Sequence, residues 1–306
     1  MIPLSWSFRV QPVLSRPLTS AVQRFPLVEA LRTAERIAVV FFVYLAILGY
    51  LRQLSLARCA YLTVIPIAIC VLGRIESARS RPWSRVTRDW IGLGLILAAY
   101  WSLEWFAAPP LAHWQEAWLS WDRALLGPLG LRRALESAGP AIPFVLEAVY
   151  LCLYLIPPIA LGLIYAYGSR PQIHRFLAVL LLGAFAVYAL LPLFPSVSPR
   201  VAYPGADLPS VITPPRVVNT WVLDHLDIST SVFPSGHVAV AFSSAFGLLA
   251  AFPRRRTIWA GAFFVAGLVY LATIHGRYHY AVDGLASIAI AAVCDVARRL
   301  GRRDES

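Results

Sequence analysis

Two short stretches of the chain place a histidine beside groups that bind anions or orient an imidazole ring. The first is Phe233-Pro234-Ser235-Gly236-His237, directly before the apolar run 238–252. Proline suits the first turn of a helix, and the free backbone N–H groups of that turn attract anions. We therefore expect Ser235 and Gly236 to bind phosphate oxygens, and His237 to protonate a departing oxygen. Taken alone, the string equally fits a helix start with a surface histidine.

The second stretch is His275-Gly276-Arg277-Tyr278-His279-Tyr280-Ala281-Val282-Asp283. On a helix, His279 and Asp283 are four residues apart and share a face. The carboxylate can then hold one imidazole nitrogen and leave the other free as a nucleophile. Arg277 could clamp the non-bridging oxygens of a phosphate. The alternative is a buried histidine–aspartate pair that only fixes helix packing.

A metal site is a second interpretation of the same stretch. His275, His279 and Asp283 fall at i, i+4 and i+8, as ligands on one helical face would. Zinc proteases with a His-Glu-x-x-His motif use the glutamate as general base, but position 276 is glycine. The missing base argues against metal catalysis. We therefore expect neither a metal nor another cofactor.

The composition indicates that these residues work in a membrane. The chain of 306 residues is 58% hydrophobic and only 14% charged, far from the values of ordinary soluble domains. All 27 basic residues are arginines, so arginine must supply any phosphate-binding cation, and this usage is compatible with a high-GC bacterial genome. The net charge of +11 fits arginines that flank membrane spans, and nucleic-acid binding is not expected. The four cysteines lie in or beside apolar runs without paired spacing, and we interpret them as packing residues.

Eight segments are apolar enough, over about the 20 residues that a bilayer requires, to be candidate spans. They are 37–51, 54–73, 90–107, 142–168, 176–194, 237–252, 259–275 and 279–298. The first two are short and their link is tight, so one long or re-entrant element is the alternative. We predict an all-α polytopic membrane bundle that forms a single domain over 1–306, with a catalytic core at about 142–298.

The arginines also predict an orientation. Residues 1–36 carry five arginines and lack the apolar stretch of a signal peptide, so this segment is expected to be retained in the cytoplasm. With the amino terminus inside, the segments 1–36, 74–88, 170–175, 254–256 and 298–303 hold 19 of the 27 arginines. The prediction is a cell-membrane protein with both termini cytoplasmic. The long loops 108–141 and 195–235 and the two histidines then face outward.

The first outer loop has the pattern of a helix that lies in the membrane interface. Trp114, Trp118 and Trp121 recur at helical spacing with leucines. Anchoring in the interfacial aromatic belt is the favoured role, and gripping of substrate is the alternative. Three charged residues are expected on other faces of this helix: Glu116, Asp122 and Arg123.

The Pro-Ser-Gly-His string, followed by His-x-x-x-Asp at the start of the last predicted span, resembles the type 2 phosphatidic acid phosphatase superfamily. That superfamily includes lipid phosphate phosphatases, vanadium haloperoxidases and fungal inositol phosphorylceramide synthases. The resemblance implies that His279 is the phosphate-accepting nucleophile, that Asp283 orients it, and that His237 protonates the leaving group.

The chain departs from the pattern of that family upstream. The first motif of the family, a lysine followed after six residues by Arg-Pro, is absent, and Arg200 in the string 195–200 is the nearest substitute. The Ser-Arg pair before the nucleophile is also missing, because Thr273 occupies the arginine position. Arg277 is the expected replacement. These departures resemble the inositol phosphorylceramide synthase-like branch.

The resemblance implies a metal-free enzyme that acts on a lipid phosphate or diphosphate held in the bilayer. Transfer to water makes it a phosphatase, whereas transfer of a phospho-head group to an alcohol such as inositol or a lipid hydroxyl makes it a phosphotransferase. A non-catalytic lipid transporter is the third hypothesis. Three acidic residues in or beside spans could mark its polar pathway, although packing roles are favoured: Glu104, Glu147 and Asp295.

Overall fold

The computed structural model describes residues 30–79, 82–205, 207–229 and 231–301, and this part of the chain is helical without strands. The predicted cytoplasmic segment 1–36 lies largely outside it. In chain order the helices are α2 (Thr33–Leu51), α3 (Leu56–Arg79), α4 (Pro82–Leu103), η1 (Glu104–Phe106), α5 (Ala112–Leu126), α6 (Leu131–Glu136), α7 (Ala141–Leu151), η2 (Leu153–Leu155), α8 (Ile156–Tyr167), α9 (Arg170–Leu190), η3 (Leu191–Leu193), α10 (Pro199–Ala202), α11 (Pro214–Leu226), α12 (Gly236–Ala251), α13 (Arg256–His275) and α14 (Ala281–Gly301).

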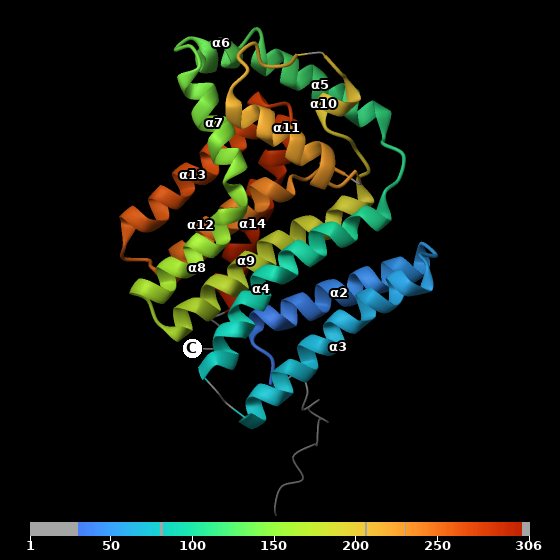
Figure 1. The fold of residues 1–306 in the computed structure, drawn as a ribbon, viewed down its shortest axis with the longest axis vertical. Coiled ribbons are helices and arrows are strands. Elements are labelled where there is room, and N and C mark those ends of the chain that lie inside the picture. Colours follow the sequence, from blue (N-terminus) through green and yellow to red (C-terminus); the bar gives the residue numbers. More distant parts are fainter. Residues whose placement is uncertain (1–29, 80–81, 206, 230, 302–306) are drawn as a thin grey trace, which may run out of the picture.

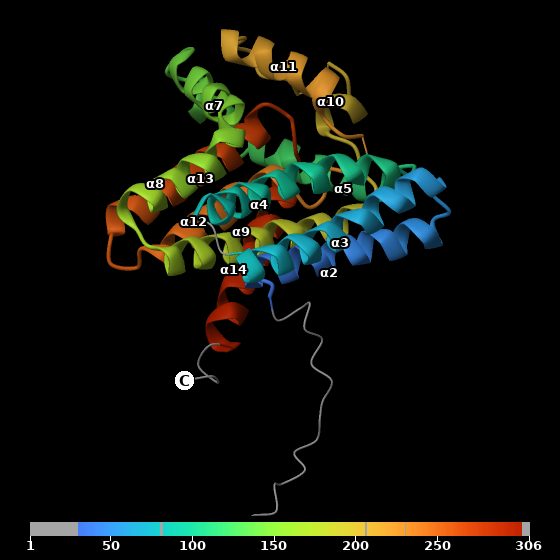
Figure 2. The ribbon, with the colours of Figure 1, turned by 60° about the horizontal axis from the view of Figure 1, so that its bottom comes forward.

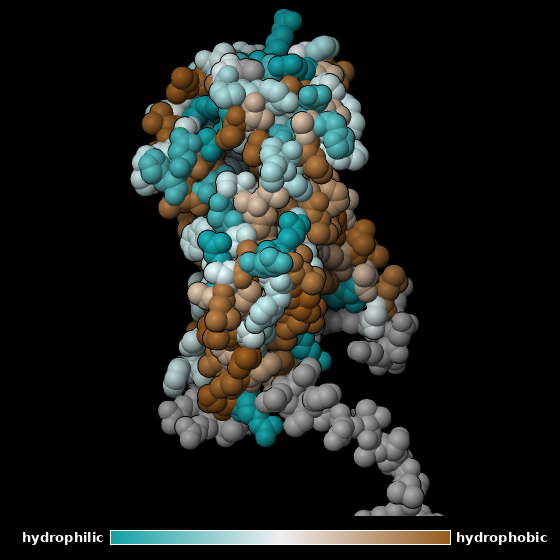
Figure 3. Space-filling view, turned by 90° about the vertical axis from the view of Figure 1, so that its right-hand side faces the viewer, coloured by the Kyte–Doolittle hydropathy of each residue, from teal (hydrophilic) through white to brown (hydrophobic). Residues whose placement is uncertain are grey.

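Several of these helices are long and apolar enough to cross a membrane. Four meet both conditions by themselves, and a fifth span results if α7 and the η2–α8 segment, which meet at a bend of 48°, count as one. Hydrophobic side chains gather on the lower part of the face in Figure 3, whereas hydrophilic ones are more frequent near its top. Each of the eight predicted segments overlaps a helix, but α12 has only 16 residues, and the count of eight spans stays a prediction.

The first two predicted segments are separate helices and not one long element. The chain turns between α2 and α3 through Gln53, whose φ of 56° lies in the left-handed region. The Leu54 N–H donates to the Gly49 carbonyl at 2.9 Å and closes the turn. The two helices then run side by side as a hairpin (Figure 1).

Helix α9 forms the centre of the bundle, with α12, α2, α14 and α4 packed around it (Figure 1). Leu180 and Ala184, halfway along α9, have no exposed surface. The close approach of α9 to α12 depends on Gly183, because a Cβ there would lie 2.1 Å from the Ser243 hydroxyl oxygen. Small residues at such crossings allow helix backbones to approach each other in membrane proteins.

Shorter helices cover one end of the bundle. Helices α5, α6, α10 and α11 gather at the top of Figure 1, where the amino end of α12 and the carboxyl end of α13 also lie. Figure 2 shows α11 on the outside of this cover. The helix predicted in the first outer loop is present as α5, but the placement of Asp122 away from its tryptophan face is wrong. Trp118 and Asp122 are four residues apart and both face inward, whereas Trp114 and Trp121 are exposed.

Candidate active site

His279 lies in the loop 276–280 between α13 and α14, and two oxygen atoms face its Nδ1 atom. Asp283 Oδ2 is 3.3 Å away and the Val232 carbonyl oxygen is 3.0 Å away. A carbonyl oxygen only accepts hydrogen bonds, so Nδ1 carries the proton and Nε2 keeps a free lone pair. Asp283, in the first turn of α14, is itself held by the Tyr280 backbone N–H at 2.9 Å. The predicted pair is formed, although His279 precedes the helix.

His237 is the second residue of α12 and faces the nucleophilic candidate directly. Its Nδ1 atom lies 3.3 Å from His279 Nε2. Two tyrosine hydroxyls from the α7–η2 segment approach the same ring, Tyr154 at 3.2 Å from Nε2 and Tyr150 at 3.4 Å from Nδ1. The structure therefore brings His237, His279 and Asp283 into one chain of contacts that is shielded from water, because all three side chains are buried.

The amino end of α12 is fixed by its own backbone and by α14. Ser235 is the N-cap residue, and its hydroxyl accepts a hydrogen bond from the Val238 N–H at 3.3 Å. The Ser235 N–H donates to the Asp283 carbonyl at 3.1 Å. The Tyr188 ring occupies the space beside Gly236, where a Cβ would lie 2.8 Å from a ring carbon. The missing side chain thus makes room for Tyr188, which is a role that the sequence pattern did not predict.

Arg277 is buried in the loop before His279 and is paired with an acidic residue of α5. Its Nη1 atom lies 2.6 Å from Asp122 Oδ2, and Asp122 Oδ1 accepts the Ala281 N–H at 2.9 Å. Burial raises the pKa of Asp122, while the bond from Ala281 and the Arg277 charge act in the opposite direction. The φ of Arg277 is 63°, a left-handed conformation that is uncommon for a residue with a side chain. Arg277 thus connects the loop 276–280 to α5.

Arg200, in α10, lies on the outer side of the same loop. Its backbone N–H donates to the Arg277 carbonyl at 3.1 Å, and its Nη1 atom lies 2.6 Å from Asp224 Oδ1. The Arg200 side chain keeps 18% of its surface exposed, against 1% for Arg277. Of the two predicted phosphate ligands, Arg200 is therefore the more accessible.

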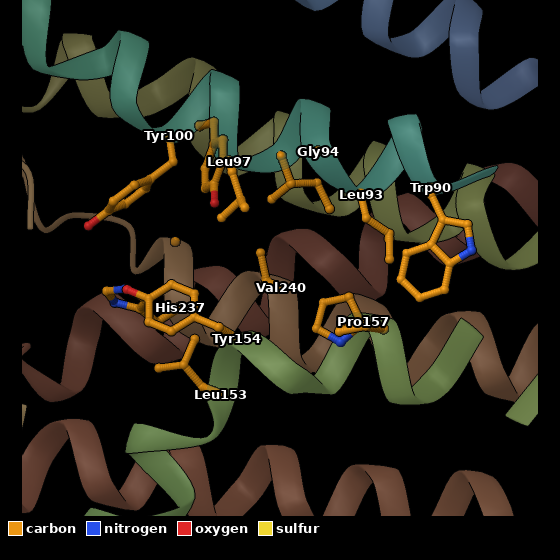
Figure 4. Close-up of a pocket in the computed structure, with 14 residues that line it drawn as sticks. Trp90, Leu93, Gly94, Leu97, Tyr100, Leu153, Tyr154, Pro157, His237 and Val240 are labelled. Carbon is orange, nitrogen blue, oxygen red and sulfur yellow. The ribbon is translucent and has the colours of Figure 1, made fainter. Parts of the chain in front are cut away.

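Two cavities border residues of the candidate site. The first has a volume of about 280 Å³, is almost entirely apolar, and extends between α4, α8 and α12 from His237 to Trp90 (Figure 4). The second has a volume of about 270 Å³ and is more polar. Its lining includes Val232, Arg200 and two carboxylates near the end of α11, Asp224 and Asp227.

Asp227 adds a charge that the sequence pattern did not reveal. It accepts the hydroxyl hydrogen bond of Tyr100, whose ring centroid lies 5.7 Å from that of His237. Burial lowers the pKa of His279 to about 4, whereas the Asp227 charge and the Val232 carbonyl act to raise it. The imidazole of His279 is therefore neutral at pH 7, as a nucleophile must be.

The acidic residues of the transporter hypothesis each have local partners. Glu147 binds Arg216 at 2.9 Å and Asn219 at 2.8 Å, both from α11, and accepts the Tyr278 hydroxyl. Glu104 accepts a hydrogen bond from the loop residue Ser229. Asp295 accepts one from Arg298, three residues later in the same helix. Glu147 thus helps to connect α11 to the loop 276–280.

The metal-ligand hypothesis for the second motif has no support from the geometry. His275 ends α13 with a buried Nε2 atom that has no hydrogen-bond partner, and it makes no recorded contact with His279 or Asp283. Within the described ranges, no group of three or more histidine, cysteine or acidic side chains is arranged to hold a metal ion.

The described part of the chain is thus a helical bundle with several helices able to cross a membrane and with a buried pair of histidines in contact. The chain belongs to the PAP2 superfamily, as predicted: the family model matches residues 116–296, more than half of the chain. The match starts in α5 and ends in α14, so it includes His237, His279, Asp283, Arg200 and Arg277, whereas Tyr100 and the α4 wall of the apolar cavity lie before it. Membership supports an enzyme of the phosphoesterase type that acts on phosphorylated substrates. No curated protein and no solved structure gives a significant match.

Proposed function

We propose that this protein is a lipid-phosphate phosphatase that works through a phosphohistidine. The observation that carries the proposal is the contact between His279 Nε2 and His237 Nδ1, at 3.3 Å, at one end of an apolar cavity. The histidine pair supplies a nucleophile and a proton donor. The cavity of about 280 Å³ has the size and polarity to hold part of a lipid tail next to them.

In the first step, the lone pair of His279 Nε2 attacks phosphorus and the bond from phosphorus to the lipid oxygen breaks. His237, which must enter this step in its protonated form, donates a proton to that oxygen, so the lipid leaves as an alcohol or, from a diphosphate, as a monophosphate. Asp283 stabilises the positive charge that develops on the phosphorylated imidazole. Because the rings are already in contact, they must separate by the width of a phosphate group before the attack.

In the second step, water attacks the phosphohistidine and His237 accepts a proton from it. Phosphate leaves, and both histidines return to their starting states. Arg200 is suited to hold phosphate oxygens during both steps, since it is partly exposed beside the polar cavity and would exchange Asp224 for substrate. Arg277 is proposed to act on the loop conformation, because its charge is already paired with Asp122.

A phosphotransferase is the second candidate, and the polar cavity favours it. That cavity borders Val232, whose carbonyl holds His279, and it presents Asp224, Asp227 and several serines. Such a lining could orient an alcohol such as inositol in place of water. The first step would be the same for both candidates, and the acceptor would decide the outcome.

The membrane arrangement is part of the proposal. We propose eight spans with both termini in the cytoplasm of a bacterial cell, and a site that opens at the outer face. The arginine distribution supports this orientation. The cover of α5, α6, α10 and α11 over the catalytic end is compatible with a substrate whose head group lies at the membrane surface.

The test is turnover by the purified protein with lipid monophosphates, lipid diphosphates and phosphodiesters, each with and without inositol. Free phosphate would indicate the phosphatase, and a new inositol phosphodiester the transferase. His279→Ala should abolish both products, whereas the matched control His225→Ala, an exposed histidine of α11, should retain them. Full activity of folded His279→Ala on every substrate would refute the mechanism. Lipid transport that survives His279→Ala without any turnover would favour the transporter.

The role of the apolar cavity has its own test. Val240→Phe should fill part of the cavity next to His237 and therefore exclude part of a lipid tail. We expect KM for long-chain substrates to rise at least tenfold, which corresponds to a loss of about 1.4 kcal/mol of binding free energy. Turnover of a short-chain, water-soluble phosphate should change little. An equal loss for both kinds of substrate would show that the substitution disturbs the catalytic residues instead.

A further inference from the structure

The side chain of Tyr150 lies against His237, although neither sequence motif includes it. Tyr150 stands near the end of α7, and only 4% of its surface is exposed. Its hydroxyl oxygen lies 3.4 Å from His237 Nδ1, the same atom that His279 Nε2 faces at 3.3 Å. The hydroxyl group therefore borders the place where the two imidazole rings meet.

The proton positions on His237 follow from its neighbours. His279 keeps a lone pair on Nε2, because its own proton is on Nδ1. A lone pair on His237 Nδ1 would face that lone pair at 3.3 Å and repel it, so Nδ1 of His237 carries a proton and donates it to His279. In the neutral ring, His237 Nε2 is then the acceptor, and the Tyr154 hydroxyl donates to it at 3.2 Å (Figure 4).

This arrangement leaves the proton of the Tyr150 hydroxyl without an acceptor. A protonated Nδ1 cannot accept a hydrogen bond, and the charged form of His237 carries a proton on both nitrogens, so the conclusion holds for either state. The Tyr150 hydroxyl makes no other hydrogen bond in the part of the chain that the structure describes. A buried donor without an acceptor costs free energy, and a catalytic role is one reason to keep it.

The ring of Tyr150 is held on two sides, so its hydroxyl has a fixed direction. It stacks on the Tyr278 ring with the centroids 4.4 Å apart, and it meets the His237 ring edge-on at 5.6 Å. Tyr278 is itself fixed, because its hydroxyl donates to Glu147 and its ring lies over Gly276, where a Cβ would come within 2.3 Å of it. A donor that is positioned in advance stabilises a developing charge without reorganisation.

We propose that Tyr150 is a further catalytic residue, whose hydroxyl donates a hydrogen bond to a non-bridging oxygen of the transferring phosphoryl group. The inference rests on the proposed function, because it places phosphorus between His279 Nε2 and His237 Nδ1. A phosphate that enters between these two atoms comes within reach of the hydroxyl, which lies beside one of them. The hydroxyl proton stays on Tyr150 throughout, so the bonds made and broken are those of the proposed reaction.

This role suits a chain whose two candidate phosphate-binding arginines are already paired with carboxylates. Arg277 contacts Asp122 and Arg200 contacts Asp224, both at 2.6 Å. Either arginine must give up an ion pair before it binds phosphate, whereas the Tyr150 hydroxyl gives up no acceptor. Tyr150 therefore binds a phosphate oxygen at a smaller cost in free energy than either arginine does.

The test compares Tyr150→Phe with the wild-type protein, as the full chain purified in neutral detergent. One measurement is steady-state turnover of the best lipid phosphate. The other is the rise in melting temperature with inorganic phosphate, which binds without any reaction. Tyr150→Phe should lower kcat roughly 10- to 100-fold, as expected for the loss of one hydrogen bond to a charged group, and should lose most of the phosphate-dependent rise. Without phosphate its melting temperature should not fall, because the removed donor has no acceptor.

Two other tyrosines provide matched controls. Tyr154→Phe removes a hydroxyl that faces the other ring nitrogen of His237, so its phosphate-dependent rise should equal that of the wild type. Tyr165→Phe removes a hydroxyl near the far end of α8, where it donates to Asp89, and should keep kcat.

The two measurements separate the role of Tyr150 from the proposed function. Wild-type kcat in Tyr150→Phe would overturn the role of Tyr150 and leave the proposed function in place. Equal phosphate-dependent rises in Tyr150→Phe and wild type would also overturn it, with or without turnover. A rise that depends on Tyr150 in a protein that turns over no substrate would support the phosphate contact and overturn the proposed function. A lower melting temperature of Tyr150→Phe without phosphate, with the rise retained, would mean that the hydroxyl serves packing alone.

Discussion

Asp283→Asn separates two influences on His279: the hydrogen bond that fixes its tautomer and the negative charge of the neighbouring carboxylate. The change keeps the shape of the side chain and removes its charge. His279 Nδ1 would still face the Val232 carbonyl at 3.0 Å, so the proton should stay on Nδ1 and Nε2 should remain the attacking atom. What is lost is the carboxylate at 3.3 Å, which stabilises the positive charge of the phosphorylated ring.

The expected loss in kcat/KM is roughly 10- to 100-fold. A hydrogen bond to a charged partner contributes about 1.5–3 kcal/mol, and each 1.4 kcal/mol is a factor of ten in rate. In a serine protease the corresponding substitution costs about 10⁴-fold, because the imidazole takes the wrong tautomer. The Val232 carbonyl should prevent that here. The melting temperature should not fall, since Asp283 is fully buried and its Oδ1 atom has no hydrogen-bond partner in the structure.

The assay is steady-state turnover of the best substrate by wild-type protein and Asp283→Asn, with the melting temperature measured on the same preparations. A loss near 10⁴-fold with an intact fold would refute the argument that Val232 fixes the tautomer. A loss in kcat/KM below threefold would show that Asp283 has no catalytic role. Asp295→Asn, a buried carboxylate of the same helix outside the site, is the control and should keep its kcat/KM.

Three other outcomes are expected. Gly236→Ala should lower the free energy of unfolding by about 1–3 kcal/mol in chemical denaturation, because the new Cβ would meet the Tyr188 ring at 2.8 Å; an unchanged value would mean that the ring moves aside freely. Asp122→Ala should cost about 3–5 kcal/mol by leaving the buried Arg277 charge unpaired, and combination with Arg277→Met should restore part of it. For a phosphodiester substrate, the acid limb of kcat/KM that reports protonation of His279 should lie near pH 4, because protonation removes its lone pair and burial lowers its pKa to about 4; an acid limb near 6.5 would contradict this.

Local patterns in the sequence were sufficient to predict the helices and the central pair. A helix that is surrounded by lipid or by other helices needs apolar side chains along its length, so an apolar run marks it. All eight predicted segments contain helix. The spacing of His279 and Asp283 is a local property, and it led to the observed contact. The contact of His237 with His279 also followed, because the alternating topology sent both residues to one end of the bundle.

The residues that surround this pair depend on tertiary contacts, which no local pattern reveals. Asp122 and Glu147 look like ordinary charges in the sequence, yet each pairs with a residue far along the chain, Arg277 in one case and Tyr278 in the other. A signal for Asp122 existed in its spacing from Trp118, four residues earlier, once that tryptophan is taken to face inward. The sequence marks Glu147 only as an acidic residue within a predicted span, and that signal does not identify Tyr278 as its partner.

These contacts give a physical reason why the chain departs from the arginine pattern of its family. Three residues near His279 are held by two helices: Arg277 by Asp122 of α5, Tyr278 by Glu147 of α7, and Tyr280 by Gln115 of α5 at 3.3 Å. An arginine this close to the nucleophile would be expected to contact phosphate, but its guanidinium is turned into α5. The loop is thereby fixed by its own contacts, and in the proposed mechanism the phosphate charge is left to Arg200 and the amino end of α12.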